Sequence, residues 1–137
     1  MTVVAPTAIH RAGFHPTAVI GTMGAAAGVS AALGMSANQL THALGIAGSM
    51  ASGIIEYLAE GTWTKRFHPG WSAHSGLQAA LLARQGFTGP RTVFEGTHGF
   101  FFAFALTAAL AMLFLSLSVV CSNQFEQLNI EQSRVIC

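Results

Sequence analysis

The chain has 137 residues, at most one domain of ordinary size, and only 8% of them are charged while 52% are hydrophobic. Because soluble domains are about one quarter charged, this composition indicates either the buried layer of a larger protein or a membrane protein. Six Lys and Arg against five Asp and Glu give a net charge of +1 without a basic patch, which argues against a nucleic-acid partner.

A first helix is predicted after an irregular lead-in of residues 1–14. His15-Pro16-Thr17 marks its start, because proline suits the first helical position, where its missing N–H loses no partner. The helix should run to about Leu33 and end at Gly34. Small residues recur along it at three- and four-residue spacings and leave one face nearly bare, which favours close packing against another helix. These residues are Gly21, Gly24, Ala25, Gly28 and Ala32.

A second helix is predicted from Ser36, which forms the pattern of a capping box with Gln39. Hydrophobic residues then recur at helical spacing. They are Leu40, Leu44, Ala47 and Ala51. Gly45, Gly48 and Gly53 each cost this segment up to about 1 kcal/mol relative to alanine. Such a cost indicates tight contacts or a nearby ligand.

The stretch at residues 61–76 is the main candidate for chemistry. It gathers two adjacent cations, two histidines and both tryptophans in a chain that is otherwise nearly free of charge. Trp63–Gly70 is predicted to be a structured loop, because Pro69 is unsuited to the interior of a regular helix.

A third helix should follow from Trp71 or Ser72 and stop at Gln85-Gly86, ahead of a turn rich in glycine and proline. Residues 54–58 either continue the second helix or form a short one of their own. No stretch shows sustained period-two alternation, so the predicted fold class is all-α.

The C-terminal part changes character. Residues 100–121 are uncharged, apolar and long enough to span a bilayer, which makes them a transmembrane candidate on hydropathy. Residues 123–137 are polar without a pattern. The predicted organisation is therefore a partial helical domain at residues 1–104, followed by a divergent tail at residues 105–137 that is first apolar and helical, then polar.

Several motifs occur in one order along the chain. They are Gly13-Phe14-His15-Pro16-Thr17 with Gly21-Thr22-Met23-Gly24, Ala43-Leu44-Gly45-Ile46-Ala47-Gly48-Ser49, Gly61-Thr62-Trp63-Thr64-Lys65-Arg66-Phe67-His68-Pro69-Gly70, Gly86-Phe87-Thr88-Gly89-Pro90, Phe94-Glu95-Gly96 and Gly99-Phe100. Together they resemble the MmgE/PrpD family, which includes 2-methylcitrate dehydratase, cis-aconitate decarboxylase and iminodisuccinate epimerase. The resemblance extends from about Ala12 to Phe104.

The resemblance implies a cytoplasmic, homodimeric, metal-independent lyase without a cofactor. Its expected reaction is elimination of water from a small di- or tricarboxylic acid, as in 2-methylcitrate dehydratase, with the family's decarboxylase and epimerase reactions as alternatives. Family members are several times longer, so this chain is expected to be an incomplete and inactive part of their large helical domain. The alternative is a non-catalytic fragment, associated with a membrane through residues 100–121. The family pattern assigns catalysis to His15 and Lys65, and substrate binding to Thr17, Arg66 and His68.

The chemistry of His15 and Lys65 follows in part from their positions. His15 directly precedes a helix start, where the partial positive charge favours a neutral imidazole that accepts a proton, and where free N–H groups can bind a carboxylate. Its simpler role is to cap the helix. Lys65 suits a carboxylate as a point charge, and the flanking Trp63 and Phe67 indicate an enclosed site. Its simpler role is that of a solvated loop lysine.

The other polar residues do not match the patterns of a shared ligand site, a metal site or a hydrolase. Lys65 and Arg66 are neighbours on an extended loop and should point in opposite directions, so they should not share one ligand. The spacings of the six histidines match no zinc motif. Cys121 and Cys137 lack a Cys-x-x-Cys spacing, so a reducing compartment and no metal site are expected. Ser49 lacks the strand-turn-helix setting of a nucleophile elbow.

Overall fold

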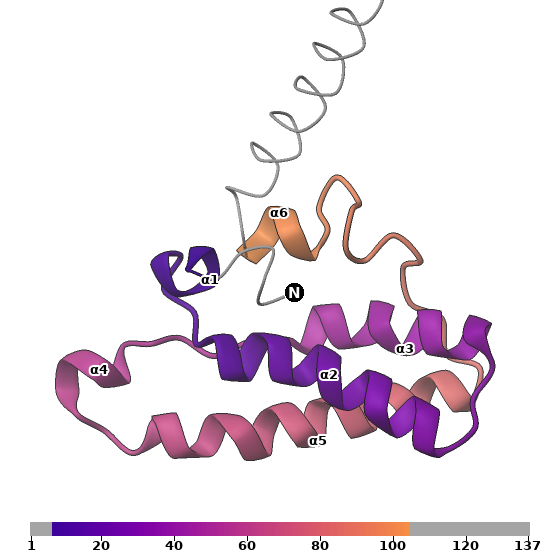
Figure 1. Ribbon diagram of the computed structural model, residues 1–137, viewed down its shortest axis with the longest axis horizontal. Coiled ribbons are helices and arrows are strands. Elements are labelled where there is room, and N and C mark those ends of the chain that lie inside the picture. Colours follow the sequence, from indigo (N-terminus) through magenta and orange to yellow (C-terminus); the bar gives the residue numbers. More distant parts are fainter. Residues whose placement is uncertain (1–6, 105–137) are drawn as a thin grey trace, which may run out of the picture.

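The computed structural model describes residues 7–104 of the chain, and this part is all-α, as predicted (Figure 1). Its helices are α1 (Ala8–Arg11), α2 (Pro16–Ala32), α3 (Ala37–Met50), α4 (Tyr57–Glu60), α5 (Thr64–Arg84) and α6 (Phe100–Phe104). The three long helices α2, α3 and α5 all contact one another and form the body of the structure. Figure 1 shows α4 at one end of this body, α1 near the start of α2, and α6 near α3 on the side away from α5.

The predicted start and end of α2 are confirmed. Pro16 occupies the first helical position after His15, and Gly34 adopts a left-handed φ of +62° just beyond the end. The lead-in is not wholly irregular as predicted, because residues 8–11 form the single turn of α1, with Ile9 buried in the core.

The capping box at the start of α3 is confirmed. The backbone N–H of Gln39 donates to Ser36 Oγ at 3.3 Å, and the backbone N–H of Ser36 donates to Gln39 Oε1 at 3.0 Å. Two of the N–H groups at the helix start therefore have partners. The helix ends at Met50, and residues 54–58 lead into the separate short helix α4 rather than continuing α3.

The prediction of a loop from Trp63 to Gly70 is wrong. Helix α5 begins at Thr64 and runs through Pro69 without a break. Proline has no N–H, so the Lys65 carbonyl lacks the donor that a helix normally supplies four residues later. Pro69 is exposed, so its ring adds no crowding to the core, and packing of α5 against α2 and α3 offsets the local cost.

The core between the long helices is built mainly from alanine. Buried alanines are Ala18, Ala26, Ala43, Ala47, Ala51, Ala79, Ala80 and Ala83. Such small side chains let the backbones approach closely, most of all at Gly76 of α5. A Cβ added there would lie 2.6 Å from the Ala26 nitrogen and 2.7 Å from the Thr22 carbonyl oxygen of α2.

The small-residue face predicted for α2 is only partly used. Gly21 lies against Ser72 of α5, where an added Cβ would come within 2.8 Å of the hydroxyl oxygen. Gly24 and Gly28, in contrast, have no atom within 4 Å of such a Cβ and are exposed. Close packing is thus confirmed at one end of the face and absent at these two glycines.

The glycines predicted to need tight contacts in α3 do have them. Gly45 meets the backbone of Gly89 and Pro90, and a Cβ at Gly48 would lie 2.5 Å from Val93 Cγ2. The segment that follows α5 therefore packs directly on the backbone of α3, which explains why side chains are missing there.

The membrane interpretation depends on residues beyond the described part. Within residues 7–104, no helix has both the length and the apolar character needed to cross a bilayer. Of the candidate span 100–121, only Phe100–Phe104 is described, as α6, with Phe100 buried. The rest of that span, the tail at residues 105–137 and both cysteines lie outside the described residues.

Candidate active site

The start of α2 is tied to the segment that follows α3. Phe14 and Ile54 form an isolated antiparallel bridge. The backbone N–H of His15 donates to the Gly53 carbonyl at 2.7 Å, and that of Ile55 donates to the Gly13 carbonyl at 3.0 Å. These bonds fix the backbone of His15 at the end of the bundle where α4 and the first turns of α5 also lie (Figure 1).

Two of the predicted site residues, His15 and His68, meet there. Their Nδ1 atoms are 2.9 Å apart and hydrogen-bonded, although the residues are 53 positions apart in the chain. The ring of Tyr57 packs edge-on against both imidazoles, at centroid distances of 5.4 Å to His15 and 5.6 Å to His68. His68 is 5% exposed and Tyr57 is 7% exposed, so the pair rests on a buried aromatic base.

His15 is the N-cap residue of α2, but its side chain makes no capping hydrogen bond. The simpler role considered for it, as a helix cap, therefore does not describe its side chain. Its ring is partly buried and turned toward His68 instead.

The surroundings of His15 favour its neutral form. Burial lowers its pKa below 6.5, and repulsion from Lys65 and from the charged forms of His68 and His10 lowers it further. The sequence predicted the same direction from the helix N-terminus. The main cause in the structure is desolvation, which disfavours the imidazolium.

The free energy of unfolding should therefore fall as the pH is lowered below 6.5, the ordinary pKa of histidine. The unfolded chain then binds a proton at His15 that the folded chain, with its lowered pKa, does not yet bind, so acid favours unfolding. Urea unfolding at a series of pH values measures this slope. His15→Asn should flatten it, whereas His98→Asn, at an exposed position, should keep it. An equally steep slope in His15→Asn would contradict the assignment.

The other predicted site residues lie on the surface near this pair. Lys65 is exposed in the first turn of α5, close enough for its charge to act on His15. Thr17 is exposed in the first turn of α2. The Arg66 guanidinium lies over the ring of Trp63, 4.9 Å from its centroid. Lys65 and Arg66 do point apart, but because neighbours on a helix lie on different faces, not because the segment is extended.

The enclosure expected around Lys65 is absent from the described part of the chain. Trp63 is 78% exposed and Phe67 is 58% exposed. Phe67, Trp71 and His74 instead stack in a row along α5, with centroid distances of 5.6 Å. The row borders a shallow, open hollow of about 390 Å³. The site is therefore open on the Lys65 side.

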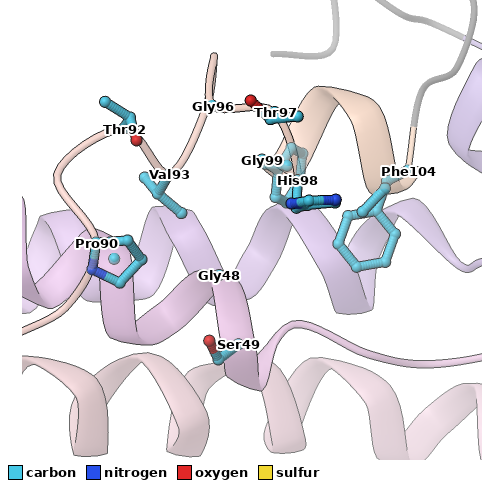
Figure 2. A pocket seen from close by; sticks show the side chains of 13 residues that line it. Gly48, Ser49, Pro90, Thr92, Val93, Gly96, Thr97, His98, Gly99 and Phe104 are labelled. Atoms are coloured by element: carbon cyan, nitrogen blue, oxygen red, sulfur yellow. The ribbon is translucent and has the colours of Figure 1, made fainter.

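A second hollow, of about 420 Å³, lies between α3 and residues 90–104 (Figure 2). Gly48 and Ser49 of α3 form its floor, and Thr92, Val93, His98 and Phe104 stand around it. The Phe104 ring also packs edge-on against Phe14, the neighbour of His15, at 4.9 Å. Ser49 belongs to a continuous helix, in keeping with the expectation that it is no nucleophile elbow.

A metal centre is not assembled in this region. Among residues 7–104, no three His, Cys, Asp or Glu side chains gather in a way that would hold an ion. The chemistry that these side chains offer is that of imidazole, ammonium and guanidinium groups.

Together, the fold and the site define a class: an all-helical domain that presents a neutral histidine and a lysine at one end of a tightly packed helix bundle. The chain belongs to the MmgE/PrpD family, because the family model described as the MmgE/PrpD N-terminal domain matches residues 1–112. This range includes the whole stretch from Ala12 to Phe104 on which the resemblance was recognised.

The chain is similar to curated proteins whose names refer to cis-aconitate decarboxylase. The chain is 41% identical over 87 residues to human cis-aconitate decarboxylase, an alignment that covers 64% of this chain and 18% of that protein. A cis-aconitate decarboxylase-like protein from Aspergillus oryzae is 39% identical over 89 residues, with 65% and 18% covered. The mouse cis-aconitate decarboxylase is 40% identical over 87 residues. The chain thus spans less than a fifth of the length of these relatives.

Proposed function

We propose that this chain carries part of the substrate site of a lyase that acts on small di- or tricarboxylic acids. One observation supports this most directly: the pKa of His15 is lowered, so its neutral form is favoured, and the ring is hydrogen-bonded to His68 with the charge of Lys65 nearby. A neutral imidazole accepts a proton, and the surrounding positive charge attracts a polycarboxylate anion.

The role proposed for His15 differs between the two reactions of this class, whereas that of Lys65 is the same. In a dehydration, a base takes a proton from carbon while hydroxide leaves and is protonated to water. In a decarboxylation, carbon dioxide leaves and an acid gives the carbon a proton in its place. In the dehydration, neutral His15 takes the proton from carbon. In the decarboxylation, His15 first takes up a proton from solvent, which a bound polycarboxylate favours, and then gives it to the carbon that carbon dioxide leaves. Lys65 binds a substrate carboxylate in both reactions, with Thr17 as a further polar contact, whereas Arg66 lies on another face of α5 and is not assigned to the same substrate. No metal or cofactor is part of the proposal.

The relatives favour decarboxylation of cis-aconitate as the first reaction to test, ahead of the dehydration of 2-methylcitrate that the family resemblance suggested. A homodimeric assembly and a cytoplasmic location belong to the same proposal. The competing proposal is a non-catalytic fragment, and the openness of the site around Trp63 favours it for the chain by itself, because bulk water reaches Lys65.

Lys65→Ala should weaken the binding of cis-aconitate about tenfold, the usual order for loss of a charge-assisted hydrogen bond. The measurement is a titration of the labelled 137-residue chain with cis-aconitate, followed by amide chemical shifts. Shifts should centre on His15 and Lys65. Arg84→Ala removes the same charge at the far end of α5 and serves as the matched control, with binding unchanged.

Two outcomes of this experiment would count against the proposal. One is the absence of shifts at His15 and Lys65 at millimolar cis-aconitate, and the other is equal weakening by Lys65→Ala and Arg84→Ala. A parallel assay for consumption of cis-aconitate or 2-methylcitrate by the chain decides between the lyase and the fragment. Consumption that Lys65→Ala abolishes would exclude the non-catalytic fragment.

A further inference from the structure

The hydrogen bond between His15 and His68 joins two like atoms, and this restricts where the protons lie. A bond between two ring nitrogens needs one N–H and one bare nitrogen. The two Nδ1 atoms are 2.9 Å apart, so one ring is protonated at Nδ1 and the other accepts at Nδ1. If both Nδ1 atoms carried a proton, the bond would be lost and two N–H groups would face each other.

The groups around His15 favour one of the two arrangements. Lys65 of α5 adds positive charge near the ring, and Tyr57 of α4 packs edge-on against it. Among the described residues, His15 makes its ring hydrogen bond through Nδ1 alone. Its Nε2 is therefore the nitrogen left for a ligand. Positive neighbours favour a bare nitrogen over an N–H at such a position, which places the shared proton on His15 Nδ1.

We propose that His68 is a positioning residue that accepts a hydrogen bond from His15 Nδ1–H and so leaves His15 Nε2 bare as the proton acceptor. The role of His15 Nε2 as an acceptor of a substrate proton rests on the proposed function. The pairing itself is a property of the chain without substrate. In this proposal His68 acts through His15, in place of the direct substrate contact that the family resemblance implied.

The packing of His68 supports this role. Its ring lies against the backbone of Gly53, where an added Cβ would come within 3.2 Å of both Cε1 and Nε2. Tyr57 covers the ring edge-on, and His68 is 5% exposed. The ring is held so that Nδ1 meets His15 while the rest of it faces protein. The same Gly53 accepts the backbone N–H of His15 at 2.7 Å, so one residue aligns both partners.

The test reads the tautomer of each histidine directly, from two-bond nitrogen–proton correlation spectra of the 137-residue chain at a pH where His15 is neutral. His15→Asn identifies the His15 signals by their loss. In the wild-type chain, His15 Nε2 should show the chemical shift of an unprotonated nitrogen and Nδ1 that of an N–H. His68 should show the reverse pattern. A protonated Nε2 on His15 overturns the proposal without the use of any His68 variant.

Two substitutions at His68 separate positioning from mere packing. His68→Phe keeps a ring between Gly53 and Tyr57 but removes the acceptor, so the His15 Nε2 signal should shift from the bare-nitrogen position toward that of an N–H. His68→Asn keeps an acceptor close to the position of Nδ1 and should restore the wild-type pattern. Equal His15 signals in all three folded proteins overturn the proposal. The spectra need no ligand, so a chain that fails to bind cis-aconitate refutes the proposed function and leaves the tautomer result standing.

Discussion

Gly76→Ala is expected to lower the free energy of unfolding by about 2–3 kcal/mol, although alanine is the better helix former. The added Cβ would lie 2.6 Å from the Ala26 nitrogen and 2.7 Å from the Thr22 carbonyl oxygen, both backbone atoms of α2. Backbone inside a helix cannot turn away as a flexible side chain does. The two helices must therefore separate, and the alanine contacts between them weaken.

The matched control lies on the same helix. Gly70 has no atom within 4 Å of an added Cβ, and it is exposed. Gly70→Ala should raise the free energy of unfolding by about 0.5–1 kcal/mol through helix propensity alone. Urea unfolding followed by circular dichroism gives both values. Effects of the same sign at the two positions would contradict the backbone contact at Gly76.

Gly89→Ala should destabilise the chain by about 1–3 kcal/mol through crowding at the other close approach. Its Cβ would lie 2.6 Å from the His42 carbonyl oxygen and 2.6 Å from the Ile46 nitrogen, both in α3. The residues after α5 would be pushed off the helix, and the wall of the hollow in Figure 2 would move with them.

The neighbouring residue provides the control for this second substitution. Thr88 is exposed, and Thr88→Ala should change the free energy of unfolding by less than about 0.5 kcal/mol. Amide exchange rates give a local readout, because Gly89→Ala should speed exchange in residues 90–99 more than in α2. Uniform exchange changes along the whole chain would show that the substitution does not act at this contact.

The sequence was sufficient to predict both ends of α2 and the start of α3, because these boundaries depend on local chemistry. Pro16 and Gly34 delimit α2, and Ser36 with Gln39 begins α3, because each of these signals acts within one turn of backbone. The sequence failed at Pro69, whose local preference to end a helix is outweighed by the packing of α5 on two other helices. That contact joins segments distant in the chain and leaves no local signal.

The candidate site was predictable in part for the same reason. His15 and Lys65 stood out by position and by resemblance, but the partner of His15 lies 53 residues away. Tyr57 and Gly53 were missed as neighbours of the histidines, because residues 54–58 showed only a short helical pattern. One signal was available: Gly53 was singled out as needing a tight contact, and the atoms nearest to an added Cβ there are Ala18 Cβ and the His68 ring.

The alanine core also limits which substitutions the domain can accommodate. Eight of the fifteen buried hydrophobic side chains between residues 7 and 104 are alanine. Substitution by a smaller residue can therefore remove almost no side-chain volume at these positions. Nearly every replacement adds volume between backbones that already touch. A side chain larger than alanine at these positions should therefore destabilise the domain, whereas substitutions at exposed positions such as Lys65 should not carry this cost.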